Sequence, residues 1–190
     1  MNTLWRGSRP IAAADAAGRY LANRLGTFPG GTGLRFHSSC AYPKGDNHPA
    51  MLAIFSGPDG RPSGLHRTYL TPSGRKAAVV SQKLSLGPLV DGGAVRLAPH
   101  GDILGIAEGI ETALAASILF GVPCWAALNA NRLAVWEPPA GVRKVVIFAD
   151  NDHSFVGQTA AFDLVASLER TVIVDIETPV RPGADWADML

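Results

Sequence analysis

The sequence predicts an α/β protein in which a parallel sheet of about four strands with flanking helices follows a small α+β subdomain with a β-meander. In the second half, short apolar runs alternate with helix-length segments, the order typical of a parallel sheet. The first half instead has short β-forming runs between turn sequences, which is typical of antiparallel hairpins. Of the 190 residues, 47% are hydrophobic and 17% charged, a composition that can bury a core.

Charge divides the chain near the same point. Residues 1–100 carry 12 Lys and Arg against 4 Asp and Glu, whereas residues 101–190 carry 5 against 12. We therefore predict a basic N-terminal subdomain over residues 1–100 and the parallel sheet domain over residues 101–190. A basic half beside an acidic half can bind a polyanion with one and a metal with the other. Alternatively, the two halves neutralise each other across an internal interface, and the sequence leaves both readings open.

In the basic half we expect one helix and several strands. Pro10 in a first helical turn and Gly26 as a stop predict a helix between them. Turn sequences at residues 57–60 and 71–74 separate the β-forming runs. The predicted strands cover residues 34–36, 51–55, 64–70, 77–80 and 94–97.

In the acidic half, strands and helices alternate. Residues 145–149 are the clearest strand, because four bulky apolar residues in a row suit a sheet that is covered on both faces. The predicted strands cover residues 103–107, 122–128, 145–149 and 171–175. The predicted helices cover residues 109–120 and 155–168, with a short helical stretch near Arg132.

Two of these strands are followed by acids: Glu108 follows the first, and Asp150 and Asp152 follow the third. Because the carboxyl ends of neighbouring parallel strands meet at one edge of a sheet, we expect the three carboxylates to converge. Carboxylate oxygens are ligands that Mg²⁺ prefers, and three clustered acids without a cation repel one another. The alternatives are a helix cap for Glu108 and an ordinary turn for the two aspartates.

Two segments resemble the signature segments of Toprim domains, which occur in bacterial-type primases, topoisomerases, nucleases and recombination proteins. They are LGIAEGIETALAA (104–116) and VVIFADNDHSFVGQTAA (145–161), about forty residues apart on the predicted strands. The form EGIETALA with ADND is most similar to the Toprim domains of phage and plasmid primase-like proteins. Residues 64–77 and 92–99 are similar to the segment that precedes Toprim in those proteins. The resemblance to Toprim itself covers about residues 101–190.

The resemblance implies a Toprim-type fold and a Mg²⁺-dependent nucleotidyl-transfer or phosphoryl-transfer activity, with Mn²⁺ as a second suitable ion. It implies general acid–base work for Glu108 and Mg²⁺ binding for Asp150 and Asp152. Asp185 and Asp188, in GADWADML (183–190), resemble acids of a family segment and are candidates for a second metal or an outer shell.

A further match is Gly157, which occupies the place of a small residue that lets the next helix approach the site. The implied partners are nucleic acid, above all single-stranded DNA, and nucleotides. Candidates for phosphate contacts lie in the basic half, although each is also readable as a solvated surface charge. They are Arg35, His66, Arg67, Lys76, Lys83 and Arg96.

Other functional classes are disfavoured. The N-terminal segment has no apolar signal core, and the longest apolar helical stretch is too short to span a bilayer, so we expect a soluble cytoplasmic protein without membrane partners. Two cysteines far apart cannot build the zinc ribbon of primases. We also see no helicase segment. Three functions stay open: a primase-like enzyme, a nuclease using the same acids, and a catalytically silent module that binds or inhibits a protein partner.

Overall fold

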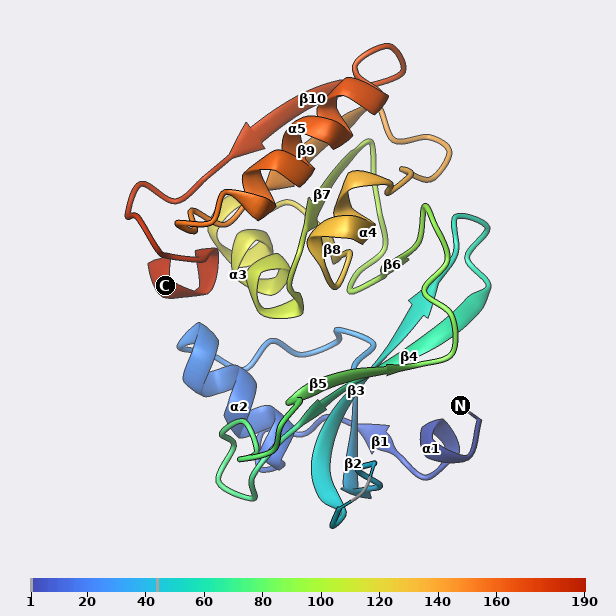
Figure 1. Cartoon of the computed structure of the whole chain (residues 1–190), viewed down its shortest axis with the longest axis vertical. Helices are drawn as coiled ribbons and strands as arrows, with labels where there is room; N and C mark the ends of the chain where they lie inside the picture. The colour runs from blue at the N-terminus through green and yellow to red at the C-terminus, as the bar shows by residue number, and fades with distance from the viewer. Residues whose placement is uncertain (1, 44) are drawn as a thin grey trace. The chain divides into compact units, whose positions relative to one another are not determined.

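The computed structural model describes residues 2–43 and 45–190 and divides into two compact units (Figure 1). The first unit comprises Met1–Phe55 and Pro62–Pro88, and the second comprises Ser56–Arg61 and Leu89–Leu190. Each unit buries its own cluster of apolar side chains. No helix in the described ranges is long and apolar enough to cross a membrane.

The first unit combines two helices with antiparallel strands that pair in chain order. Its apolar cluster includes Leu52, Leu65 and Tyr69, which alternate along two paired strands. The helices are α1 (Asn2–Arg6) and α2 (Ala16–Leu25). The strands are β1 (Arg9–Pro10), β2 (Arg35–Cys40), β3 (His48–Ser56), β4 (Pro62–Tyr69) and β5 (Lys83–Leu86).

The predicted start of the first long helix was wrong. Pro10 lies in β1, at the edge of the sheet, where its missing N–H costs no ladder hydrogen bond. The helix begins only at Ala16, because the Asp15 carboxylate accepts the Ala12 amide at 2.7 Å and pairs with Arg9. The segment before Asp15 is therefore held as a turn.

The strand predicted over residues 77–80 was also wrong. The Ala77 amide donates to Tyr69 O and the Val79 amide donates to Ala77 O, both at 2.9 Å, so the chain turns tightly here. Val80 is fully exposed. The next strand, which pairs with β4, is β5, a few residues further along the chain.

The second unit is an α/β layer structure, which confirms the predicted fold class. Among its described residues, the strand order is β6-β8-β7-β9-β10, with β8, β7, β9 and β10 parallel and β6 antiparallel. The strands are β6 (Ala94–Val95), β7 (Ile103–Ala107), β8 (Cys124–Ala126), β9 (Lys144–Phe148) and β10 (Ile173–Glu177). The helices are α3 (Ile110–Phe120), α4 (Ala130–Ala134), α5 (Val156–Leu168) and the 3-10 turn η1 (Trp186–Met189).

Apolar side chains cover both faces of this sheet. Alternate residues of β7 and β9, such as Ile106 and Ile147, join Leu133 of α4 and Leu164 of α5 in one buried cluster. On α3 and η1, Phe120 and Trp186 meet edge to face, with ring centroids 5.0 Å apart, and Phe148 of β9 contacts both rings. Trp186 thus packs the C-terminal turn onto the sheet.

Gly105 of β7 lies in a tightly packed layer. A β-carbon at this position would lie 2.8 Å from Phe148 Cε2 and 2.9 Å from Cys124 Sγ. Those distances are shorter than van der Waals contact, so the close packing of β7 against its neighbours requires glycine.

Candidate active site

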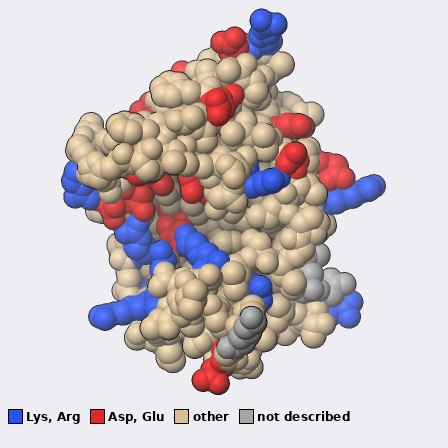
Figure 2. Space-filling model, viewed as in Figure 1, with Lys and Arg blue, Asp and Glu red and all other residues tan. Residues whose placement is uncertain are grey.

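The acids predicted to form a site follow two neighbouring strands. β7 and β9 pair in parallel, with Ala107 opposite Phe148. Glu108 therefore leaves the sheet level with Ala149, and Asp150 lies one residue further at the same edge. In Figure 2, acidic side chains gather on the left of the second unit, near the loop after β9 and the C-terminal turn.

Glu108 is held through its backbone and reaches the start of α5. Its carbonyl oxygen accepts the Leu128 amide at 2.8 Å. Its Oε2 lies 3.8 Å from the point where a β-carbon on Gly157 would stand. Glycine at 157 therefore leaves open the space beside this carboxylate.

Asp152 shares that space, because its Oδ2 lies 3.5 Å from the same point at Gly157. Its Oδ1 accepts hydrogen bonds from Ser154 Oγ at 2.6 Å and from the Ser154 amide at 2.8 Å. These bonds lower the pKa of Asp152, the Ser154 hydroxyl most, with further help from the Phe155 and Gly157 amides. Asp152 is therefore ionised at neutral pH.

Asp150 differs from Asp152 in that its pKa is raised. Burial, and then the charges of Asp185 and Glu108, raise its pKa to about 7, against a hydrogen bond from Thr112 Oγ1 at 3.3 Å that lowers it. A half-buried carboxyl among other acids is close to half-protonated at neutral pH. A divalent cation would relieve this repulsion, and carboxylate oxygens are the donors that suit Mg²⁺. The carboxylate oxygens at this edge are therefore chemically suited to Mg²⁺.

Asp185 and Asp188 form a capping box at η1. Asp185 Oδ1 accepts the Asp188 amide at 3.0 Å, and Asp188 Oδ2 accepts the Asp185 amide at 3.2 Å. Both therefore fix the C-terminal turn. Of the two, Asp185 is close enough to raise the pKa of Asp150, whereas Asp188 is exposed.

The acids of this edge influence one another. Glu108 and Asp152 meet beside Gly157, and Asp150 interacts electrostatically with Asp185, Glu108 and Asp152. Within residues 2–43 and 45–190, no three His, Cys, Asp or Glu side chains are placed to hold one metal ion together. Metal binding by these acids stays a prediction.

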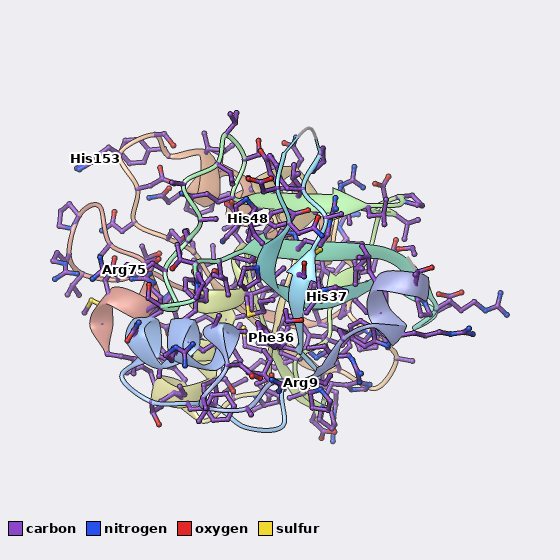
Figure 3. All side chains as sticks on the ribbon, turned by 90° about the horizontal axis from the view of Figure 1, so that it is seen from below. Arg9, Phe36, His37, His48, Arg75 and His153 are labelled. Atoms are coloured by element: carbon purple, nitrogen blue, oxygen red, sulfur yellow. The ribbon has the colours of Figure 1, made fainter. Side chains whose placement is uncertain are left out.

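Two hydroxyl side chains that bind the acids of this edge were not predicted. Thr112 and Ser154 bind the two aspartates, and their positions one helical turn after Glu108 and two residues after Asp152 were the available signals. Glu111 is a buried acid, only 5% exposed. His153, between Asp152 and Ser154, is an exposed loop residue that lies on the outside of the molecule (Figure 3).

Three of the predicted phosphate-binding cations bind polar and aromatic groups of their own unit. Arg35 Nε donates to Ser8 Oγ at 2.8 Å, and Arg96 Nη2 donates to Gly57 O at 2.8 Å. Arg67 is 8% exposed, and its Nη1 is 3.5 Å from Ala41 O. Each guanidinium also lies over an aromatic ring.

The other three differ in exposure. His66 is buried, with Nδ1 3.4 Å from Ser85 Oγ, whereas Lys76 and Lys83 are exposed. Their contacts with phosphate stay predictions.

Lys76 lines a pocket of about 640 Å³ in the first unit. This pocket exists because the loop after β4 lies close to α2: a β-carbon on Gly74, whose φ is +78°, would lie 2.6 Å from Arg19 Cβ. Figure 3 shows Arg75 beside α2. The sequence did not indicate this grouping of cationic and polar side chains. The pocket is lined by Tyr20, Asn23, Arg24, Gly74, Arg75 and Lys76.

Comparison with known structures identifies the fold of both units. The primase fragment of the bacteriophage T7 primase-helicase protein is 13% identical with a TM-score of 0.55, covering 95% of this chain and 69% of that chain. A DNA primase domain from Pseudomonas aeruginosa is 14% identical with a TM-score of 0.51, covering 74% and 46%. The DnaG primase catalytic domain bound to single-stranded DNA is 13% identical with a TM-score of 0.51, covering 90% and 56%. The chain thus spans about half the length of these bacterial structures.

Comparison with family models agrees with the resemblance in the sequence. No curated protein matches the chain. Residues 1–97 match a family described as a domain of unknown function (DUF7146), and residues 103–190 match the Toprim domain. The prediction of a Toprim domain is confirmed. Residues 103–190 are a Toprim domain with the fold of primase catalytic cores, and the chain belongs to the DUF7146 family.

Proposed function

We propose that this protein is a primase-like enzyme that transfers nucleotidyl or phosphoryl groups on nucleic acid with Mg²⁺, or Mn²⁺, as its ion. The observation that carries the proposal is the acidic edge of the Toprim sheet, where burial and then the charges of Asp185 and Glu108 raise the pKa of Asp150 to about 7. A carboxylate whose pKa is raised in this way is stabilised most by a bound cation.

Each acid has a distinct role in this proposal. Asp152, which is ionised and fixed by Ser154, would hold the ion together with Asp150. The bound ion would neutralise charge on the phosphoryl oxygens as it develops. Glu108 would accept the proton of the attacking hydroxyl.

We also propose a division of labour between the two halves of the chain. Residues 101–190 would carry out the chemistry, and the basic residues 1–100 would hold single-stranded DNA and nucleotides. The pocket with Arg24, Arg75 and Lys76 supports this role, because clustered cations bind phosphates without reading sequence.

The central test uses labelled single-stranded DNA with Mg²⁺ or Mn²⁺, with and without nucleotides. Short new products that require nucleotides support the proposal, whereas strand loss without nucleotides identifies a nuclease. Glu108→Gln should lower the rate by at least about 100-fold, the usual contribution of a general base. Asp163→Asn, which changes an exposed acid of α5, is the matched control and should leave the rate unchanged. Equal activity of the Glu108 variant and the control would contradict the assigned role.

The space at Gly157 gives a second prediction. Gly157→Ala should keep Mg²⁺ affinity near that of the wild type and stabilise α5 by about 0.5–1 kcal/mol, because the added methyl group meets both carboxylates at ordinary contact distance. Gly157→Leu should fill the space between Asp152 and Glu108 and weaken Mg²⁺ binding about tenfold or more, equivalent to ~1.4 kcal/mol. Calorimetric Mg²⁺ titration and thermal unfolding measure both effects. Unaltered Mg²⁺ affinity in the leucine variant would place the ion elsewhere.

A catalytically silent Toprim module that binds a protein partner is the second candidate. It is favoured by the arrangement of the acids, since no three of them in the described ranges are placed to hold one metal ion. Stoichiometric association with a partner, retained when Glu108, Asp150 and Asp152 are all changed to alanine, would support this function over catalysis.

A further inference from the structure

Two residues with strained backbones flank the acidic edge. Leu128 has φ 79° and Phe155 has φ 58°, and they are the non-glycine residues with positive φ in the parts of the chain that the structure describes. Left-handed backbone is unfavourable for a residue with a β-carbon. Such strain persists where surrounding structure enforces it, often at functional sites. Both residues follow strands of the sheet that carries the acids.

The backbone amide of each strained residue donates to the backbone carbonyl of a predicted site acid. The Leu128 amide donates to Glu108 O at 2.8 Å. The Phe155 amide lies 3.5 Å from Asp152 O and also lowers the pKa of the Asp152 carboxyl. The loop that fixes Asp152 therefore also fixes Phe155.

The Phe155 side chain gives little to the folded state. It is 65% exposed at the start of α5. An exposed phenyl ring buries little apolar area, so it does not offset the strain of its backbone. The ring is therefore a large, uncharged, flat surface held three residues after a carboxylate that we assign to the metal.

We propose that Phe155 stacks on an unpaired nucleobase whose phosphate would be bound through the Mg²⁺ ion assigned to Asp150 and Asp152, an inference that rests on the proposed function of those acids. Every base has a face that can stack on an aromatic ring, and stacking is tolerant of sequence. A phenyl ring has no hydrogen-bonding group, so the contact would hold any base. It would also add affinity at the acidic edge without adding charge.

Phe162 provides the matched control. It is also 65% exposed and lies two turns further along α5, in ordinary helical backbone. The two phenylalanines therefore share chemistry, exposure and helix, and they differ in distance along the chain from the acidic loop.

The variant Phe155→Gly separates function from stability. Glycine adopts positive φ freely, so the midpoint of thermal unfolding should not fall below that of the wild type. Affinity for a base-containing ligand should fall about fivefold or more, the lower end of what one base–aromatic stack contributes. Phe155→Tyr should retain the affinity, and Phe162→Ala should leave it unchanged.

Two pairs of ligands identify the molecule whose base stacks on Phe155. With Mg²⁺, ATP is compared with inorganic tripolyphosphate, and oligothymidylate is compared with an abasic strand of equal length. Phe155→Gly should weaken binding of ATP, or of oligothymidylate, towards that of the base-free analogue, and the affected pair shows whether a nucleotide or a strand is held. Wild-type protein that binds no ligand of either pair would overturn the proposed function and this inference together. Wild-type protein that binds them, with no change in Phe155→Gly, would overturn the stacking role alone.

Discussion

Asp150→Asn should stabilise the metal-free protein by about 4 kcal/mol at pH 8 and remove its response to Mg²⁺. The folded-state pKa of Asp150 is about 7, raised from its ordinary 3.8 mainly by burial and by Asp185 and Glu108. Each unit of such a shift corresponds to ~1.4 kcal/mol. Asparagine has no charge to bury, and its Oδ1 can still accept the Thr112 hydroxyl.

The sign of the pH dependence follows from the raised pKa. Between pH 4 and pH 7 the folded protein binds more protons at Asp150 than the unfolded chain does, so this group lowers stability as pH rises through that window. The advantage of Asp150→Asn should be absent near pH 4 and complete above pH 7. Urea unfolding of both proteins at several pH values, without metal, measures it.

Adding Mg²⁺ completes the test. At 100 times its dissociation constant, the ion should stabilise the wild type by about 2.7 kcal/mol and the variant by little. A variant that is less stable than the wild type at pH 8 would contradict the raised pKa of Asp150. An equal Mg²⁺ response in both proteins would contradict its role as a ligand.

Gly105→Val should destabilise the Toprim domain by about 1–3 kcal/mol, the range for overpacking a filled core. The added β-carbon would meet Phe148 and Cys124 at 2.8–2.9 Å, and all three residues lie on paired strands that cannot move apart without losing their ladder. Glu108 and Asp150 follow β7 and β9, so the loss of stability should also weaken Mg²⁺ binding.

Gly101→Val is the matched control for this substitution. A β-carbon at Gly101 would have no neighbour within 4 Å, and its φ is not positive. Its unfolding midpoint in urea should therefore stay near that of the wild type. If both variants lose stability equally, β-branching and not packing is the cause.

The fold of the second unit was predictable because its signals are local. The strand over residues 145–149 is an uninterrupted apolar run, and the structure places β9 there. The helix predicted over residues 109–120 ends at Phe120, before Gly121 with φ 66°. In the first unit the local signal misled: Pro10 suits a first helical turn, but the bonds of Asp15 to Ala12 and Arg9 delay the helix.

The sequence predicted that the three acids share one edge of the sheet, but it did not predict the pKa of Asp150. Glu108, Asp150 and Asp152 follow strands, so their common edge follows from parallel pairing. The pKa of Asp150 depends first on burial and then on Asp185 and Glu108, with Thr112 opposing them, and these groups come from other segments of the chain. The strain at Phe155 was also hidden, because positive φ is ordinarily signalled by glycine or asparagine.

The neighbouring position of β7 and β9 also has a consequence for folding kinetics. Their acids are about forty residues apart in sequence, so in the unfolded chain they titrate almost independently. They repel one another only when the two strands pair. Part of the electrostatic cost of the site therefore falls on the step that assembles the centre of the sheet. A cation that bridges the acids would act on the rate of that step as well as on the finished protein.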